Sequence, residues 1–168
     1  ELTNNYRVEV QNSVISHATY PQVGSIILSM SKRIMAEVTS VADDHIYYTD
    51  TDSIFIDKQG LSMLPPTLTG SNPGQFHVDF SMSGTNVRAV EGIFLAPKTY
   101  CLRLTNDEDE KEFHVRMKGI PKNAHADRVQ DYNGDYMAMF RDLEHKTLSF
   151  DLLAGGTVRF EFKKNLSV

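Results

Sequence analysis

Two aspartates stand one residue apart in the segment Tyr-Tyr-Thr-Asp-Thr-Asp-Ser at positions 47–53. If the segment is extended, Asp50 and Asp52 project to the same side, because side chains alternate along a strand. Two unit charges about 4 Å apart repel by roughly 4 kcal/mol at an effective dielectric near 20, so a bound cation would stabilise the pair. Magnesium is commonly held by one or two carboxylates plus substrate phosphates. The pair is therefore compatible with a magnesium site for nucleotidyl transfer, in which two ions stabilise the attacking and leaving oxygens.

The same aspartates are also compatible with a purely structural role. Asp and Thr are common in tight turns, where their side chains hydrogen-bond to nearby backbone. Strand-forming residues flank the pair, so the sequence predicts a β-hairpin over 46–56 with the acidic residues at its tip. Asp-x-Asp alone does not separate a metal site from a polar turn.

Two downstream segments carry side chains that suit nucleic-acid contacts. In a strand over 98–100, Lys98 and Tyr100 would share one face and place an ammonium for a phosphate oxygen beside a phenol. Lys118, in Met-Lys-Gly-Ile at 117–120, offers a second cation to backbone phosphate. Taken alone, each segment is also typical of an exposed lysine or a half-buried tyrosine without a ligand.

Together the three segments resemble family B DNA polymerases. The segment at 47–55 is similar to motif C, which lies at the tip of a palm hairpin, although Thr49 stands where a small residue or Cys is more usual. Lys98-Thr99-Tyr100 resembles the Lys-x-Tyr motif. Lys118-Gly119 resembles the segment that follows it in the branch found in organellar plasmids, phages and viruses, many of which use a protein primer. The order and intervals of the segments agree with that branch.

The resemblance implies a role for each of these residues. Asp52 would be the principal ligand shared between two Mg²⁺ ions and Asp50 its supporting partner. Lys98, Tyr100 and Lys118 would contact nucleic acid. The implied partners are primer-template DNA, a dNTP, the remainder of the polymerase with its motif A and motif B regions, and a terminal protein primer.

Motif A supplies a further metal-binding aspartate in this family, and motif B supplies a lysine that holds the triphosphate. Neither pattern precedes Gln22, and no exonuclease carboxylate pattern is present. The expectation is therefore a C-terminal palm and thumb portion, which would be incomplete and inactive alone.

Two other functions remain open at this stage. The chain would be a non-catalytic DNA-binding or assembly subunit of a split polymerase if a second chain carried motifs A and B. It would be a glycosyltransferase if Asp50 and Asp52 held manganese against a nucleotide-sugar diphosphate. The second alternative explains neither Lys98-Thr99-Tyr100 nor Lys118-Gly119.

Secondary structure must position these residues. After Pro21, apolar residues recur at helical spacing and predict an amphipathic helix of about five turns with one buried stripe; the stripe consists of Val23, Ile26, Ile27, Met30, Ile34 and Val38. The stretch 60–84, rich in Pro, Gly, Ser and Thr, predicts a connector. Strands are expected at 87–94, 99–104 and 113–117, with the acidic run 106–112 as a solvated turn.

The last part of the chain changes character. Residues 132–143 predict a short helix, and alternation over 158–163 predicts a strand. The predicted fold class is α+β: an antiparallel palm-type sheet packed on helices, followed by a small mixed thumb subdomain. The predicted division is 1–122 for the palm portion and 123–168 for the thumb-like subdomain.

Composition limits the other possibilities. The 168 residues carry a net charge of −5, but residues 98–168 hold 12 Lys+Arg against 5 in residues 1–97, so the second half is the better phosphate contact. A single cysteine excludes an internal disulfide. Without a signal peptide or apolar span, we expect a soluble, intracellular protein without membrane contact. The family resemblance implies a virus, phage or linear plasmid as its source.

Overall fold

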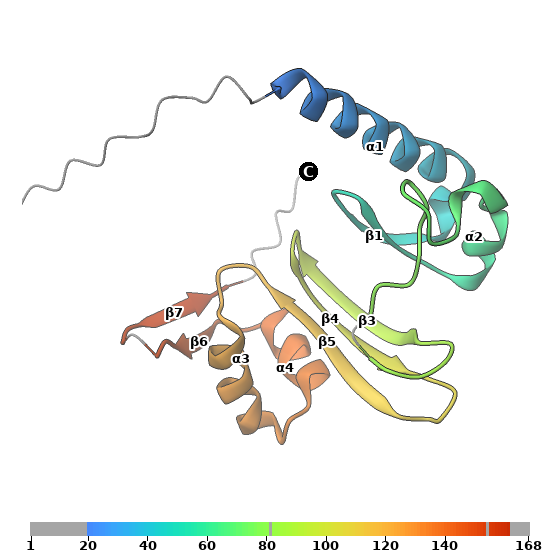
Figure 1. Ribbon diagram of the computed structural model, residues 1–168. Helices are drawn as coiled ribbons and strands as arrows, with labels where there is room; N and C mark the ends of the chain where they lie inside the picture. The colour runs from blue at the N-terminus through green and yellow to red at the C-terminus, as the bar shows by residue number, and fades with distance from the viewer. Residues whose placement is uncertain (1–19, 81, 154, 162–168) are drawn as a thin grey trace, which may run out of the picture.

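The computed structural model describes residues 20–80, 82–153 and 155–161, and it is a mixed α+β structure (Figure 1). The predicted class is confirmed at that level. The α-helices are α1 Pro21–Ala42, α2 Lys58–Met63, α3 Lys122–Arg128 and α4 Tyr136–Leu143. The strands are β1 Ile46–Asp50, β2 Ser53–Ile56, β3 Arg88–Ala96, β4 Thr99–Thr105, β5 Lys111–Met117, β6 Leu148–Asp151 and β7 Thr157–Phe160.

All of the strand pairs are antiparallel, and they form separate small sheets: β1–β2, β3–β4–β5 and β6–β7. The strands expected at 46–56, 87–94, 99–104 and 113–117 are therefore confirmed within a few residues. The first five residues of the acidic run 106–112 form the predicted β4–β5 turn, and the last two begin β5. Buried Asn106 holds this turn because its side-chain oxygen accepts hydrogen bonds from the backbone N–H groups of Glu108 and Glu110.

Helix α1 begins with Pro21 in its first turn, as predicted. The prediction that its whole apolar stripe is buried is wrong. Val38 is fully buried and Ile34 packs against the same cluster, whereas the first four members are at least half exposed: Val23, Ile26, Ile27 and Met30. The reason is geometric, because β1–β2 and α2 lie against the C-terminal half of α1 and its N-terminal half extends past them (Figure 1).

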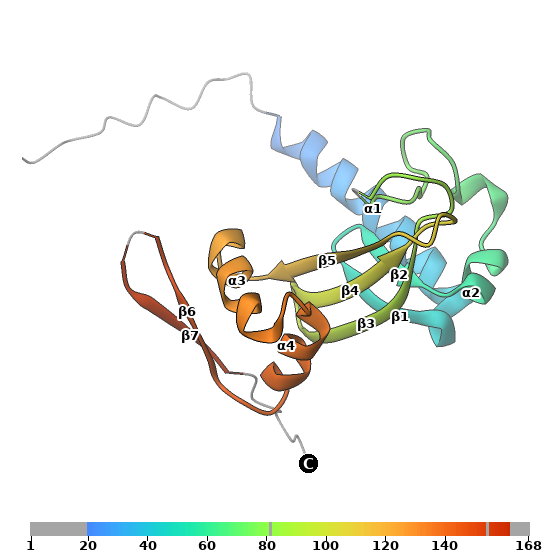
Figure 2. The same cartoon turned by 90° about the horizontal axis from the view of Figure 1, so that it is seen from below.

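Strand β4 is buried on both faces. On one face, Cys101 joins a cluster with α3 and α4; on the other, Tyr100, Leu102 and Leu104 join a cluster that includes the first hairpin. Seen from below, α3 and α4 lie on one side of β3–β5 and α1 lies on the other (Figure 2). The central sheet therefore fixes the acidic hairpin relative to the C-terminal part of the chain.

The largest buried cluster joins the sheet to the C-terminal elements. Phe140 and Phe150 are fully buried in it, and they pack with Cys101 from β4 and Met117 from β5. It therefore draws residues from both sides of position 122, and the division into palm and thumb stays a prediction. The expected helix in 132–143 is α4, and the expected strand is β7; Phe162 and Lys163 of that pattern lie outside the described residues.

Among the α-helices and strands of the described residues, α2, α3 and β6 were not predicted. Helix α2 falls at the edge of the expected connector and is capped by Asp57, whose carboxylate accepts the Gly60 N–H at 2.7 Å. Within the described ranges, no helix is long and apolar enough to cross a membrane.

Candidate metal and nucleic-acid site

The acidic tip is a two-residue turn between β1 and β2. Asp50 pairs with Ser53 in the strand register, which leaves Thr51 and Asp52 in the turn. Thr51 has a φ of 58°, in the left-handed region. The Asp50 carbonyl accepts the Asp52 N–H at 2.7 Å and the Ser53 hydroxyl at 3.1 Å. These bonds hold the turn tight and place both aspartates at the hairpin tip.

The two aspartates have different surroundings. Asp50 ends β1 and its side chain is 23% exposed, whereas Asp52 lies in the turn and is exposed. The expectation that both lie on a strand and share a face by alternation is therefore not met, because the turn begins at Thr51. Asp52 remains open to a ligand, and Asp50 is the residue with protein partners.

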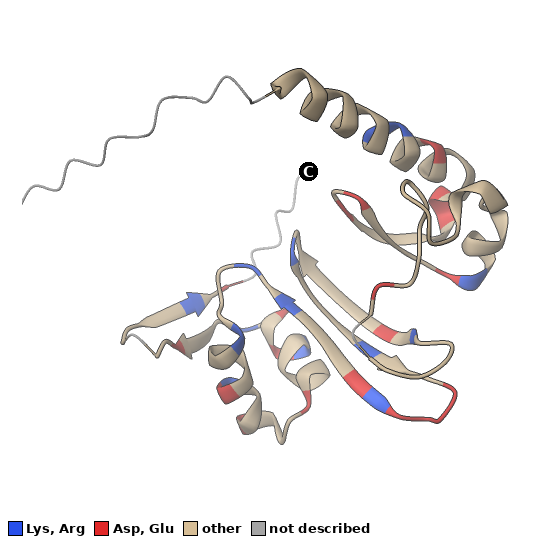
Figure 3. Cartoon of the chain, in the orientation of Figure 1, with Lys and Arg blue, Asp and Glu red and all other residues tan. Residues whose placement is uncertain are grey.

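The principal partner of Asp50 is Lys98, 48 residues further along the chain. Its ammonium donates to Oδ1 of Asp50 at 2.7 Å and to Oδ2 at 2.9 Å. This contact lowers the pKa of the Asp50 carboxyl and raises the pKa of Lys98. The acidic tip of the first hairpin thus lies beside the basic tip of the β3–β4 turn (Figure 3).

Lys98 and Tyr100 do not share a strand face, contrary to the sequence prediction. Lys98 belongs to the two-residue β3–β4 turn and has a φ of 61°, whereas Tyr100 lies on β4. The Tyr100 ring is 8% exposed and belongs to what we call the aromatic cluster, which consists of Tyr48, Phe55, Phe80, Phe94, Tyr100 and His114. Burial raises the pKa of the Tyr100 phenol. Most of its ring packs against the protein itself.

Lys118 lies next to the Lys98 turn. Its backbone N–H donates to the Lys98 carbonyl at 3.0 Å and to the Thr99 hydroxyl at 3.3 Å, and its side chain is exposed. The end of β5 is therefore held against the β3–β4 turn. Three of the predicted site residues, Asp50, Lys98 and Lys118, meet at one edge.

Tyr48 is a residue of this site that sequence reasoning did not single out. Its hydroxyl accepts the backbone N–H of Lys98 at 2.7 Å, and its ring stacks on Phe94. The available signal was its position two residues before Asp50 on the same strand, which places both side chains on one face.

The donor set suits a magnesium ion only in part. In the described residues, no group of three or more His, Cys, Asp or Glu side chains is placed to hold a metal. Asp50 and Asp52 still provide carboxylates at one tip, and Mg²⁺ is commonly bound through one or two carboxylates with phosphates completing its shell. The pair fits such an ion when further oxygen ligands come from elsewhere.

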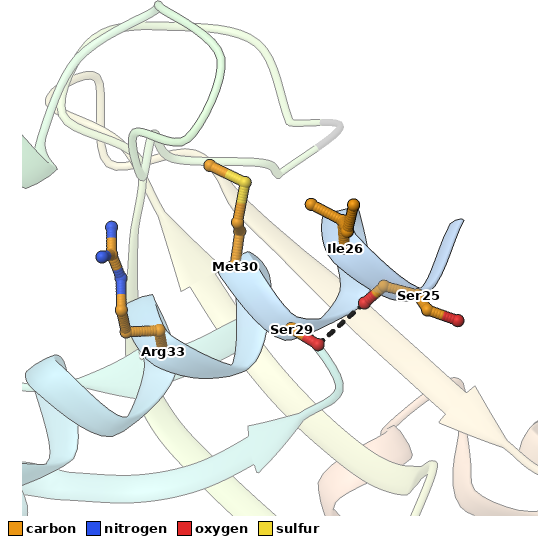
Figure 4. A pocket seen from close by; sticks show the side chains of 5 residues that line it. All are labelled: Ser25, Ile26, Ser29, Met30 and Arg33. Carbon is orange, nitrogen blue, oxygen red and sulfur yellow. Dashed lines mark hydrogen bonds between the residues drawn. The ribbon is translucent and has the colours of Figure 1, made fainter. Parts of the chain in front are cut away.

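Two hollows on the described surface do not include the acidic tip. One is an open hollow on α1, lined by Ser25, Ile26, Ser29, Met30 and Arg33 (Figure 4). A second runs along β1 and is lined by Thr39, Asp43, Ile46, Tyr47, Tyr48 and Thr49. Neither is lined by Asp50, Asp52 or Lys98.

Comparison with known proteins identifies a protein of similar sequence. Over 107 residues the chain is 36% identical to a protein of Podospora anserina. That protein is described as a probable DNA polymerase. The aligned part is 64% of this chain but only 7% of the polymerase relative, so the chain spans a small share of that protein's length. No protein-family model matches the chain, and no solved structure matches it.

Proposed function

We propose that this chain is the C-terminal palm and thumb portion of a family B DNA polymerase of the protein-primed branch. The observation that carries the proposal is the acidic tip at Asp50 and Asp52, fixed beside Lys98, in a chain that is similar to a probable DNA polymerase. That similarity supports a portion of a DNA polymerase. The branch and the palm assignment draw on the order of the motifs.

Asp52 is the principal metal ligand in this proposal, and Asp50 supports it. The exposed Asp52 carboxylate is free to coordinate a metal ion. The hydrogen bonds that the Asp50 carbonyl accepts within the turn fix the backbone from which both carboxylates extend. When bound, two magnesium ions would stabilise negative charge on the attacking and leaving oxygens of nucleotidyl transfer. The missing carboxylate comes from a motif A aspartate outside the described residues.

Lys98 and Lys118 supply cations for the phosphates of the primer-template or the dNTP. They project from adjoining turns at the edge that carries the acidic tip, and both are exposed. Tyr100 has a different part from the one expected of an open phenol. Its buried ring packs against Tyr48 and Phe55 and thereby supports the β1–β2 hairpin.

The proposal is tested with the complete polypeptide that carries this sequence and with the 168-residue chain alone. With primer-template, dNTPs and Mg²⁺, we expect primer extension by the complete polypeptide and none by the isolated chain. Failure of the complete polypeptide to extend any DNA or protein primer would overturn the proposal.

A split polymerase is the second candidate, because the described residues lack a third carboxylate at the tip. Co-purification with a chain that carries motifs A and B would favour it. Salt-sensitive DNA binding without such a partner would favour a non-catalytic module. The glycosyltransferase alternative would require a manganese-dependent thermal shift with a nucleotide sugar but none with primer-template DNA.

A further inference from the structure

The first hairpin and the β3–β4 turn meet through two polar contacts that share Lys98. Its backbone N–H donates to the Tyr48 hydroxyl at 2.7 Å, and its ammonium donates to both carboxylate oxygens of Asp50. Tyr48 and Asp50 lie on the same face of β1, two residues apart. One lysine is therefore held at its backbone and at its side-chain end by neighbouring positions of one strand.

The Lys98 backbone needs such support. Its φ of 61° is in the left-handed region, which is unfavourable for a lysine and persists when surrounding contacts fix it. The Tyr48 hydroxyl is one of these contacts, and the bond from the Lys118 N–H to the Lys98 carbonyl is another. Both hydrogen bonds involve the Lys98 backbone, so they fix the position from which its side chain extends.

Tyr48 is itself rigidly placed. Its ring stacks on Phe94 with a centroid distance of 5.1 Å and an interplanar angle of 17°, and it contacts Phe55 and Tyr100. Its hydroxyl is therefore a fixed acceptor at the edge of the aromatic cluster. A chain of contacts runs from the cluster through this hydroxyl and Lys98 to the Asp50 carboxylate.

We propose that Tyr48 is a positioning residue that holds Lys98 as a tethered counter-ion on Asp50, and that a divalent cation binding at the hairpin must displace this ammonium. The inference rests on the proposed function in so far as that function requires the cation. A metal ion and an ammonium compete because both need the same two oxygens and repel each other. Once displaced, Lys98 remains anchored by its backbone and is available to a phosphate oxygen.

The test measures Mn²⁺ binding to the 168-residue chain by paramagnetic broadening of the amide signals of residues 50–53. Lys98→Ala should lower the half-broadening concentration about thirtyfold, the effect of one unit charge about 4 Å from a divalent cation in water. Lys98→Met, which keeps the stem, should do the same. Lys118→Ala is the matched control, since it removes an equal charge nearby without a contact to Asp50, and it should change the concentration much less.

Tyr48→Phe separates positioning from packing, because it removes the hydroxyl and keeps the ring. We expect exchange of the Lys98 amide to accelerate about fivefold, the typical worth of one hydrogen bond, and Mn²⁺ to bind more tightly than to the unaltered chain. Tyr47→Phe is the control, since the neighbouring Tyr47 is 68% exposed. It should change neither quantity.

Unchanged Mn²⁺ binding in both Lys98 variants, or an equal gain in Lys118→Ala, would overturn the inference. Equal exchange rates of the Lys98 amide in the Tyr48 and Tyr47 variants would show that Tyr48 does not position Lys98. These readouts need neither DNA nor turnover, so they can succeed when the complete polypeptide fails to extend a primer. Conversely, primer extension with unaltered Mn²⁺ binding in the Lys98 variants would reject this inference alone.

Discussion

His125 lies in α3 with 6% of its surface exposed, and its Nδ1 is 3.1 Å from the Tyr136 hydroxyl. Burial lowers the pKa of His125, as it does for His114 in the aromatic cluster. The unfolded chain takes up protons near the ordinary value of 6.5, whereas the folded chain resists them until lower pH. The stabilising effect of the neutral rings is therefore complete above 6.5 and is lost as the pH falls below it.

We predict that the free energy of unfolding falls between pH 7.5 and pH 5.5, and that His125→Gln makes this fall shallower. Glutamine can still hydrogen-bond with Tyr136 but does not titrate. Urea unfolding at the two pH values measures the difference. His145→Gln is the control because that side chain is 72% exposed. An unchanged pH dependence in His125→Gln would contradict the assignment.

The residue types in the sequence predicted part of the candidate site but not the contacts within it. The acidic tip was predicted because Asp50 and Asp52 stand between two strand-forming segments. The ion pair from Lys98 could not be read from the sequence, because it depends on how two hairpins pack. The burial of Tyr100 follows from the same packing, which places its ring against that of Tyr48.

At the scale of one element, helix α1 shows that a regular apolar spacing does not by itself determine which residues are buried. Its apolar spacing is regular throughout, but only the part against β1–β2 and α2 is covered. Periodicity reports that a face is apolar, and the position of the neighbouring elements decides how much is buried. The helices α2 and α3 were missed for the opposite reason, because neither has a long apolar period.

The two ends of the α1 stripe should respond differently to the same substitution. Ile26→Ser should change the free energy of unfolding by less than about 0.5 kcal/mol, because Ile26 is 59% exposed. Val38→Ser should cost more than about 2 kcal/mol, since Val38 is fully buried and the change leaves a cavity and a buried hydroxyl. Denaturant unfolding measures both. Equal losses would show that the exposed end is covered in solution.

At the scale of the whole molecule, one buried cluster joins β4 and β5 to α4 and the β6–β7 hairpin. Phe140→Ala should therefore destabilise the chain by about 3–5 kcal/mol, the usual cost of truncating a buried phenylalanine. The loss should appear both in β4 amide exchange and in denaturant unfolding. A loss confined to α4 would contradict a shared core.

The α+β class and the hairpins β1–β2 and β4–β5 were accessible from the sequence because local alternation and turn residues specify antiparallel neighbours. The arrangement of the separate sheets was not, since it depends on contacts such as the one between Tyr48 and Phe94. The acidic tip provides two carboxylates, and the proposed function assigns the third metal ligand to the remainder of the polymerase.

The central claim is that Asp52 holds the metal used for nucleotidyl transfer. The most direct measurement is the single-turnover rate of first-nucleotide addition by the complete polypeptide with Asp52→Asn, at saturating primer-template and Mg²⁺. Asp109→Asn, which removes the same charge from the β4–β5 turn, is the matched control. We predict at least about a 100-fold loss for Asp52→Asn, because metal stabilisation of the transition state amounts to several kcal/mol, with DNA binding kept and the control near full rate. Equal rates for the two variants would contradict the account.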